Sequence, residues 1–112
     1  MAEYTDDDVG CYFDGAVGFA YNAWRLINLA HEHEMLVDLG TLADVDFTAT
    51  VIDLTDDQFD KLVYLSDYAV DWLNENTLRP PFIEGRREYY LHWSWEDGDF
   101  GLWKYDWNGD RL

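Results

Sequence analysis

The last third of the chain carries the pattern that most constrains its fold. Two runs rich in aromatic residues, 89–95 and 100–107, flank the segment Glu96-Asp97-Gly98-Asp99. Asp-Gly between two β-forming runs is typical of a tight two-residue turn, because both turn positions take positive φ angles. The pattern therefore predicts an antiparallel β-hairpin that turns at Asp97 and Gly98.

This turn also determines which residues face each other across the hairpin. The predicted pairs are Trp95 with Phe100, Trp93 with Leu102 and Leu91 with Lys104 on one face, and His92 with Trp103 and Tyr90 with Tyr105 on the other, with Trp107 beyond them. Because side chains alternate between the two faces of a strand, both faces carry aromatic rings. One face can pack on helices, and the second must be covered by another segment or left open.

The first third of the chain is predicted to be mostly helical, from Cys11 to about Val37. Small apolar residues recur there at spacings of three and four, which is the period of an amphipathic helix. Gly15 and Gly18 each weaken a helix by about 0.5–1 kcal/mol relative to Ala, so the sequence leaves open whether the helical region is interrupted near them. Gly40 is the expected helix stop.

The middle of the chain is predicted to hold a strand and a second helix. Alternating apolar and polar residues from Asp44 to Asp53 favour a half-buried strand, with a helix as the alternative. Thr55 is then the expected N-cap of a helix to about Asn76, as Thr5 is of a first turn near the N-terminus. The expected core face of the later helix consists of Phe59, Leu62, Val63, Ser66, Ala69, Val70 and Leu73.

Together these elements predict an α+β fold. It would contain a long N-terminal helical region, one strand, a second amphipathic helix, and a C-terminal aromatic antiparallel β-hairpin forming a small sheet. A length of 112 residues suits one small acidic domain across residues 1–112. Apolar residues make up 48% of the chain and aromatic residues 18%, which argues against disorder.

The charge of the chain excludes whole classes of ligand. Twenty-four Asp and Glu stand against seven Lys and Arg, which gives a net charge of −17. Such a chain repels phosphates and anionic lipid head groups, and it attracts basic surfaces. We therefore expect no direct binding to nucleic acid or membrane, and a basic, nucleic-acid-binding protein is the expected partner.

The second predicted helix carries a row of acids on the side opposite its core face. The row consists of Asp57, Asp60, Asp67, Asp71 and Glu75, with Tyr64 among them, within an arc of about 80° and a rise of about 27 Å. One interpretation of this acidic row is a solvated helix face. The other is a surrogate for backbone phosphates, which are also regularly spaced negative charges recognised by Lys and Arg.

Two further groups are candidate partner-binding residues. Glu96, Asp97 and Asp99 at the predicted turn could extend the negative field. Tyr90, Trp103, Tyr105 and Trp107 would form an aromatic patch on the second hairpin face, because Tyr and Trp are enriched at interface hot spots. A hairpin edge can also pair with its copy, so a homodimer is a further option.

Catalytic, cofactor and metal sites are not expected. The segment His31-Glu32-His33-Glu34 is the most metal-like cluster, but residues two apart on a helix do not face each other. Cys11 stands among acids that raise a thiol pKa and suppress the thiolate, so it is expected to be a core thiol. The chain lacks a nucleophile-elbow or phosphate-loop motif. We therefore expect a protein that is not an enzyme.

The compartment expected from the sequence is the cytoplasm. The first residues are acidic and lack the basic start and apolar run of a signal peptide. No stretch approaches the 18 apolar residues of a membrane span. The lone Cys11 cannot form an internal disulfide, which fits a reducing compartment.

In size, charge and aromatic content the chain resembles small acidic inhibitors that phages and mobile elements carry against restriction and CRISPR machinery. This resemblance implies a non-enzymatic anti-CRISPR or anti-restriction type of inhibitor, acting in the host cytoplasm, that occludes a nucleic-acid site by charge mimicry. The alternative is a structural or assembly module of an acid-rich or salt-adapted proteome. That module would be homodimeric through the aromatic hairpin.

Overall fold

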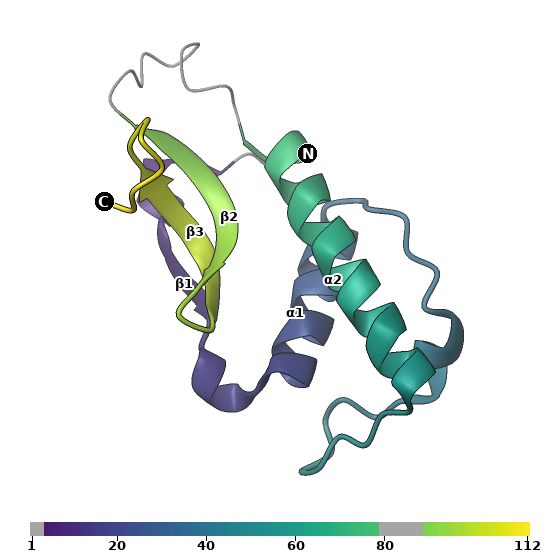
Figure 1. The fold of residues 1–112 in the computed structure, drawn as a ribbon. Helices are drawn as coiled ribbons and strands as arrows, with labels where there is room; N and C mark the ends of the chain where they lie inside the picture. Colours follow the sequence, from purple (N-terminus) through teal and green to yellow (C-terminus); the bar gives the residue numbers. More distant parts are fainter. Residues whose placement is uncertain (1–3, 79–88) are drawn as a thin grey trace.

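The computed structural model describes residues 4–78 and 89–112, and within them it confirms the α+β class. The main elements are β1 (Gly10–Phe13), α1 (Phe19–Glu32), α2 (Asp56–Asn76), β2 (Tyr90–Glu96) and β3 (Asp99–Tyr105), with short 3₁₀ helices η1 (Asp6–Asp8), η2 (Gly15–Val17) and η3 (Gly40–Asp44). Figure 1 shows the sheet beside the two helices, with α2 packed across α1. No helix in the described ranges is both long and apolar enough to cross a membrane.

The C-terminal hairpin forms in the predicted register. β2 and β3 pair antiparallel, with Trp93 opposite Leu102 and Tyr90 opposite Tyr105. The turn takes positive φ at both central residues, 53° at Asp97 and 86° at Gly98. These values are what a two-residue turn needs to match the twist of its strands. Local turn chemistry therefore predicted the register of this hairpin correctly.

The region predicted to be mostly helical, Cys11 to about Val37, contains a shorter helix, and the break left open near Gly15 and Gly18 occurs. Residues 10–13 form β1, which pairs antiparallel with β3, so the sheet has the order β1-β3-β2. The helix α1 begins only after Gly18, whose φ of 104° is incompatible with a helix, and it ends at Glu32 rather than near Gly40. Residues 10–13 pair with a strand far along the chain instead of joining the helix. The helical spacing of apolar residues corresponds to an actual helix only from Phe19 onward.

The strand predicted over Asp44–Asp53 is also wrong. Asp44 is the last residue of η3, and the residues that follow form a turn and bends. Asp46 accepts hydrogen bonds from the backbone N–H and the hydroxyl of Thr48, at 2.9 and 2.6 Å, a local turn that competes with strand pairing. Phe47 is buried and stacks on Trp24 with 5.6 Å between ring centroids. The apolar residues of this segment therefore anchor a loop on α1 instead of lining a sheet.

The helix α2 has the predicted bounds. Thr55 and Gln58 form a capping box, in which the Thr55 hydroxyl accepts from the Gln58 N–H and the Gln58 amide accepts from the Thr55 N–H. Leu62, Ser66, Ala69 and Leu73 are buried as predicted, and Leu65 joins them. Phe59 departs from the prediction, because 46% of its surface is exposed.

The core is organised around Trp93 of β2, which is fully buried. Its ring packs edge-on against Tyr4 and Tyr12 and stacks on Phe100. Its indole Nε1–H donates to the Thr77 hydroxyl at 2.9 Å, and that hydroxyl donates to the Leu73 carbonyl at 2.6 Å. The C-terminal end of α2 and the middle of the hairpin are thus joined by directional hydrogen bonds within an aromatic core.

Candidate partner-binding surface

The acidic row lies on the solvent side of α2. Its five carboxylate residues are all exposed, and 63% of Tyr64 is exposed. Their side opposes the buried residues of the same helix, which pack on α1 and β2. A helix holds this spacing rigidly over a rise of about 27 Å from Asp57 to Glu75. The row is therefore a fixed line of negative charge available to a partner.

The basic side chains of the described part lie over aromatic rings. Lys61 lies 5.9 Å from the Tyr64 ring centroid and Lys104 lies 4.8 Å from that of Tyr89. The Arg25 guanidinium lies 4.5 Å from the Phe13 centroid, and the Arg111 guanidinium lies 4.9 Å from the Trp103 centroid. These are cation–π distances. Each Lys and Arg in residues 4–78 and 89–112 is thus held against a ring.

The C-terminal end of the acidic row meets the hairpin. The side-chain amide of Asn74 donates to the Trp93 carbonyl at 3.0 Å and accepts from the Trp93 N–H at 2.7 Å. This pair of bonds occupies the edge of β2, where an added strand would otherwise bind. Partial burial lowers the pKa of His92 below its usual value, and the nearby Asp71 carboxylate opposes this change.

The outer face of the hairpin is partly covered by the C-terminal residues of the chain. Tyr105 is buried; its ring stacks on Tyr90 and its hydroxyl donates to Glu96. Burial, followed by that hydrogen bond, raises the pKa of Tyr105 to about 12. Residue 111 forms a bridge with Tyr105, and the Leu112 N–H donates to the Lys104 carbonyl at 2.8 Å. Of the predicted patch, Trp107 is the most exposed, at 59%.

Trp103 lies flat on this outer face. Its indole N–H donates to the Ser94 carbonyl at 3.0 Å. A Cβ at Gly101 would lie 2.7 Å from the Trp103 ring and 2.3 Å from the Gly10 carbonyl oxygen, so only glycine fits there. Trp103 therefore forms part of the outer surface without projecting from it.

The acids at the hairpin turn have different surroundings. Asp97 is exposed, whereas the Asp99 carboxylate accepts from the Gly15 N–H at 2.6 Å. Gly15 approaches Gly98 so closely that a Cβ on Gly15 would lie 2.7 Å from the Gly98 oxygen. Glu96 accepts from the Tyr105 hydroxyl. Asp99 thus ties the turn to the segment before α1, and Asp97 is the turn acid that faces solvent.

An apolar groove separates the acidic row from the hairpin turn. It encloses about 410 Å³ and is lined by Gly15, Phe19, Val63, Asp67, Trp95 and Gly98. The Phe19 centroid lies 5.8 Å from that of Trp95 and 6.1 Å from that of Phe59. Sequence reasoning missed this groove, because Phe19 stands within the longer predicted helical region and Val63 was assigned to the core face of the later helix. Phe19 leaves 43% of its surface exposed at the groove.

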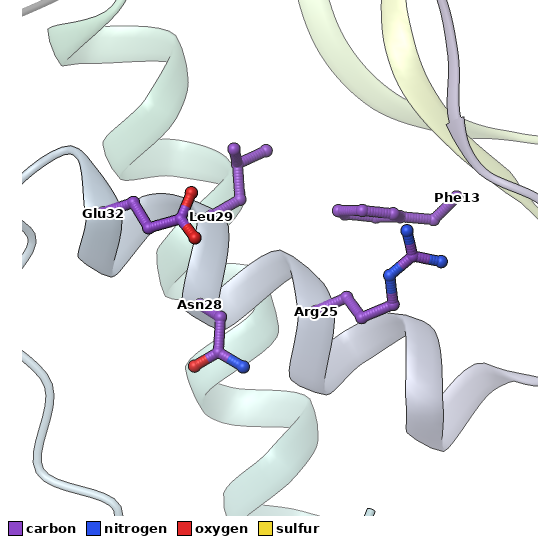
Figure 2. A pocket seen from close by; sticks show the side chains of 5 residues that line it. All are labelled: Phe13, Arg25, Asn28, Leu29 and Glu32. Atoms are coloured by element: carbon purple, nitrogen blue, oxygen red, sulfur yellow. The ribbon is translucent and has the colours of Figure 1, made fainter. Parts of the chain in front are cut away.

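A second, smaller pocket lies on α1 (Figure 2). It encloses about 240 Å³ and is lined by Phe13, Arg25, Asn28, Leu29 and Glu32. Figure 2 shows the Arg25 guanidinium beneath the Phe13 ring, with Glu32 on the other side of the pocket. Within this pocket the Arg25 guanidinium is thus in cation–π contact with the Phe13 ring.

The residues considered for metal or thiol chemistry are separated. His31 Nδ1 lies 3.0 Å from the Met35 carbonyl oxygen, and His33 Nε2 lies 2.7 Å from the Tyr4 hydroxyl. Within the described residues, no group of three or more His, Cys, Asp or Glu is placed to hold a metal ion. Cys11 is exposed, which corrects the expectation of a core thiol. Desolvation, followed by the Asp99 and Asp14 charges, raises the pKa of its thiol.

Comparisons with known proteins do not assign the chain to a family. No protein-family model matches it, and neither the curated proteins nor the solved structures include a significant match.

Proposed function

We propose that the protein is a non-enzymatic inhibitor that binds a basic, nucleic-acid-handling protein and occludes its nucleic-acid site. The acidic row of α2 would take the place of backbone phosphates, as in the anti-CRISPR and anti-restriction inhibitors of phages. The observation that carries this proposal is the exposure of all five acids along one rigid helix, on a chain of net charge −17.

The use of the basic residues supports the same proposal. A solvated helix face is commonly laced with Lys and Arg at spacings of three and four, which stabilise the helix. Here Lys61 is the basic residue within α2, and it lies over Tyr64. The row therefore retains a concentrated negative field, which would speed association with a basic cleft and make binding depend on salt.

Aromatic residues outside the row would supply the remainder of the affinity. Contacts between apolar surfaces are far less sensitive to salt than exposed ion pairs. One such group is Trp107 and Tyr90, whose ring centroids are 5.2 Å apart. The other is the groove pair Phe19 and Trp95, which are also in ring contact. A partner that covers the acidic row and one of these groups would gain both orientation and binding energy.

The proposal is tested with a neutralised row and a matched control. The test variant carries Asp60→Asn, Asp67→Asn and Asp71→Asn; the control carries Asp44→Asn, Asp53→Asn and Asp110→Asn, which are exposed acids outside the row. Both variants change the net charge by the same amount. Each protein is used to recover partners from nuclease-treated host lysate, and the recovered protein is then assayed for binding to its nucleic acid.

The expected result is recovery of a basic protein whose nucleic-acid binding is blocked by the wild type and by the control, but not by the row variant. Equal inhibition by the folded row variant would remove the acidic row from the mechanism. Recovery of no basic protein, or of one whose nucleic-acid binding is unaffected, would reject the function.

A second candidate function rests on the spread of acids beyond α2. Asp44, Asp53 and Asp110 are exposed on three other segments. Such dispersal fits the charge-rich surface of a structural or assembly module in an acid-rich or salt-adapted proteome. Under this alternative the two triple variants would behave alike in every binding assay, so the same experiment distinguishes the two functions.

A further inference from the structure

We propose that the apolar groove between α2 and the hairpin turn is a receptor for one arginine side chain of the basic partner. This inference rests on the proposed function and adds to it a defined contact. The acidic row supplies a general attraction for positive charge, whereas the groove would select a particular side chain and fix the orientation of the complex.

The shape of the groove suits a long side chain with a flat end. Its wall is made by Phe19 and Trp95, whose ring centroids are 5.8 Å apart, and by Val63 of α2. Its volume of about 410 Å³ lies within the range of small-ligand pockets, about 300–1,000 Å³. The methylene groups of an arginine would pack on Val63, and its guanidinium plane could stack on a ring.

The charge of the groove is complementary to arginine. Asp67 of the acidic row lines one side, and Gly98, between Asp97 and Asp99, lines the other. The Asp99 carboxylate accepts from the Gly15 N–H, whereas Asp67 in the lining and Asp97, which precedes Gly98 in the chain, are exposed. An apolar wall with carboxylates at its border fits a cation with an apolar stem. An anionic or purely aliphatic side chain would be repelled or would leave the carboxylates without a partner.

The position of the groove is fixed by close backbone contact at the turn. Gly15 approaches the Gly98 carbonyl so closely that a side chain on Gly15 would collide with it. The Gly15 N–H also donates to Asp99 across this contact. The groove is therefore largely preformed, and binding would require little rearrangement of the backbone.

The same pairing occurs inside the molecule. The Arg25 guanidinium lies 4.5 Å from the Phe13 centroid and 5.5 Å from that of Tyr21. Figure 2 shows this guanidinium beneath the Phe13 ring. Arginine is favoured over lysine at such places, because its planar group stacks on rings and donates to a carboxylate through two parallel N–H groups. A guanidinium in the groove would combine ring contact with a charge-assisted hydrogen bond to Asp67.

The test uses peptides, so it does not require the partner. Three acetylated and amidated peptides carry arginine, lysine or citrulline at the same three positions, separated by glycine. Citrulline has the shape of arginine without its charge. Each peptide is titrated into the full-length wild type, Asp67→Asn, Phe19→Ala and the control Asp57→Asn, with affinity measured by calorimetry and folding checked by circular dichroism.

We expect the arginine peptide to bind more tightly than the lysine peptide, and the citrulline peptide to bind least. Loss of the Asp67 charge should weaken the arginine peptide by about tenfold, as loss of one charge-assisted hydrogen bond does. Phe19→Ala should also weaken it and should reduce the preference for arginine over lysine. Asp57→Asn, which removes an equal charge from the far end of the row, should have much less effect.

Equal binding of the arginine and lysine peptides, or equal weakening by Asp67→Asn and Asp57→Asn, would overturn the groove as an arginine receptor. Either result would leave the proposed function standing, since a diffuse acidic field would account for it. Conversely, selective binding of the arginine peptide would support the groove as an arginine receptor even if the lysate experiment recovered no basic protein. The two proposals therefore fail by different results.

Discussion

The contact between α2 and the hairpin has two ends that are built differently. At the C-terminal end of the helix, Asn74 and Thr77 form hydrogen bonds with Trp93, which is fully buried. At the other end, Val63 and Trp95 enclose an open apolar groove beside exposed Phe19. Burial of the Trp93 ring excludes water at the first, closed end, and the hydrogen bonds fix its orientation. The second, open end leaves apolar surface exposed, so the part of the junction that stabilises the fold is separate from the part that we propose binds a partner.

The largest effect expected at the closed end is that of Trp93→Ala. Loss of a fully buried Trp costs about 3–5 kcal/mol, a large part of the stability of a small domain. Phe19→Ala at the open end should cost much less, because 43% of Phe19 is exposed. Urea unfolding followed by circular dichroism measures both. Similar losses for the two variants would contradict the division between a structural end and an open end.

Asn74→Ala tests the hydrogen bonds of the closed end directly. It leaves the N–H and carbonyl of Trp93 without their partner, and we expect a loss of about 1–3 kcal/mol. Asn76→Ala is the matched control, because Asn76 is exposed and its side chain donates to the Trp72 carbonyl of its own helix. The control should change stability by less than about 0.5 kcal/mol.

The same variant should expose the edge of β2. Sedimentation at increasing protein concentration would show self-association of Asn74→Ala if that edge becomes able to pair with a copy. A wild type that dimerises as strongly as the variant would mean that Asn74 does not protect the edge.

At the open end, neutralising Asp67 should separate stability from binding. Asp67 and Asp71 are four residues apart on α2, and like charges at that spacing destabilise a helix by about 0.2–0.5 kcal/mol. Asp67→Asn should therefore raise the melting temperature slightly in low salt, and sodium chloride should reduce the difference from the wild type. A variant less stable than the wild type in low salt would show that the Asp67 carboxylate has a structural role.

The smallest effect concerns His92, at the junction between the acidic row and the hairpin. Its pKa is lowered in the folded state, so the unfolded chain binds a proton first as the pH falls below about 6.5. The contribution of His92 to stability is thus lost as the pH falls from that value towards the folded pKa, and it is constant above about pH 7. His92→Gln should show a shallower decline over this interval in denaturant titrations. A steeper decline would mean that Asp71 outweighs the burial of His92.

The elements predicted correctly from the sequence are those determined by local chemistry. The turn at Asp97-Gly98 fixed the hairpin register, and the capping box of Thr55 fixed the start of α2. The exposed acidic row followed from the period of that helix. None of these features depends on a distant part of the chain.

The features that were missed depend on distant contacts. β1 forms because residues 10–13 pair with β3, about ninety residues later in the chain. The sequence of either segment by itself does not indicate this pairing. Phe47 fits the alternating pattern of a strand, but it is buried by stacking on Trp24, which lies in α1. The groove combines Phe19, Val63 and Trp95 from three elements, so no local pattern could indicate it.

The strand order β1-β3-β2 also has a consequence for synthesis on the ribosome. The first strand to leave the exit tunnel takes its place beside the last, so the sheet cannot be completed until residues 99–105 have been translated. Until then Tyr12 and Phe13 have no sheet to join, although α1 and α2 can already dock on each other. The nascent chain must therefore remain unaggregated with aromatic side chains exposed, and mutual repulsion among its many carboxylates would help to keep neighbouring chains apart.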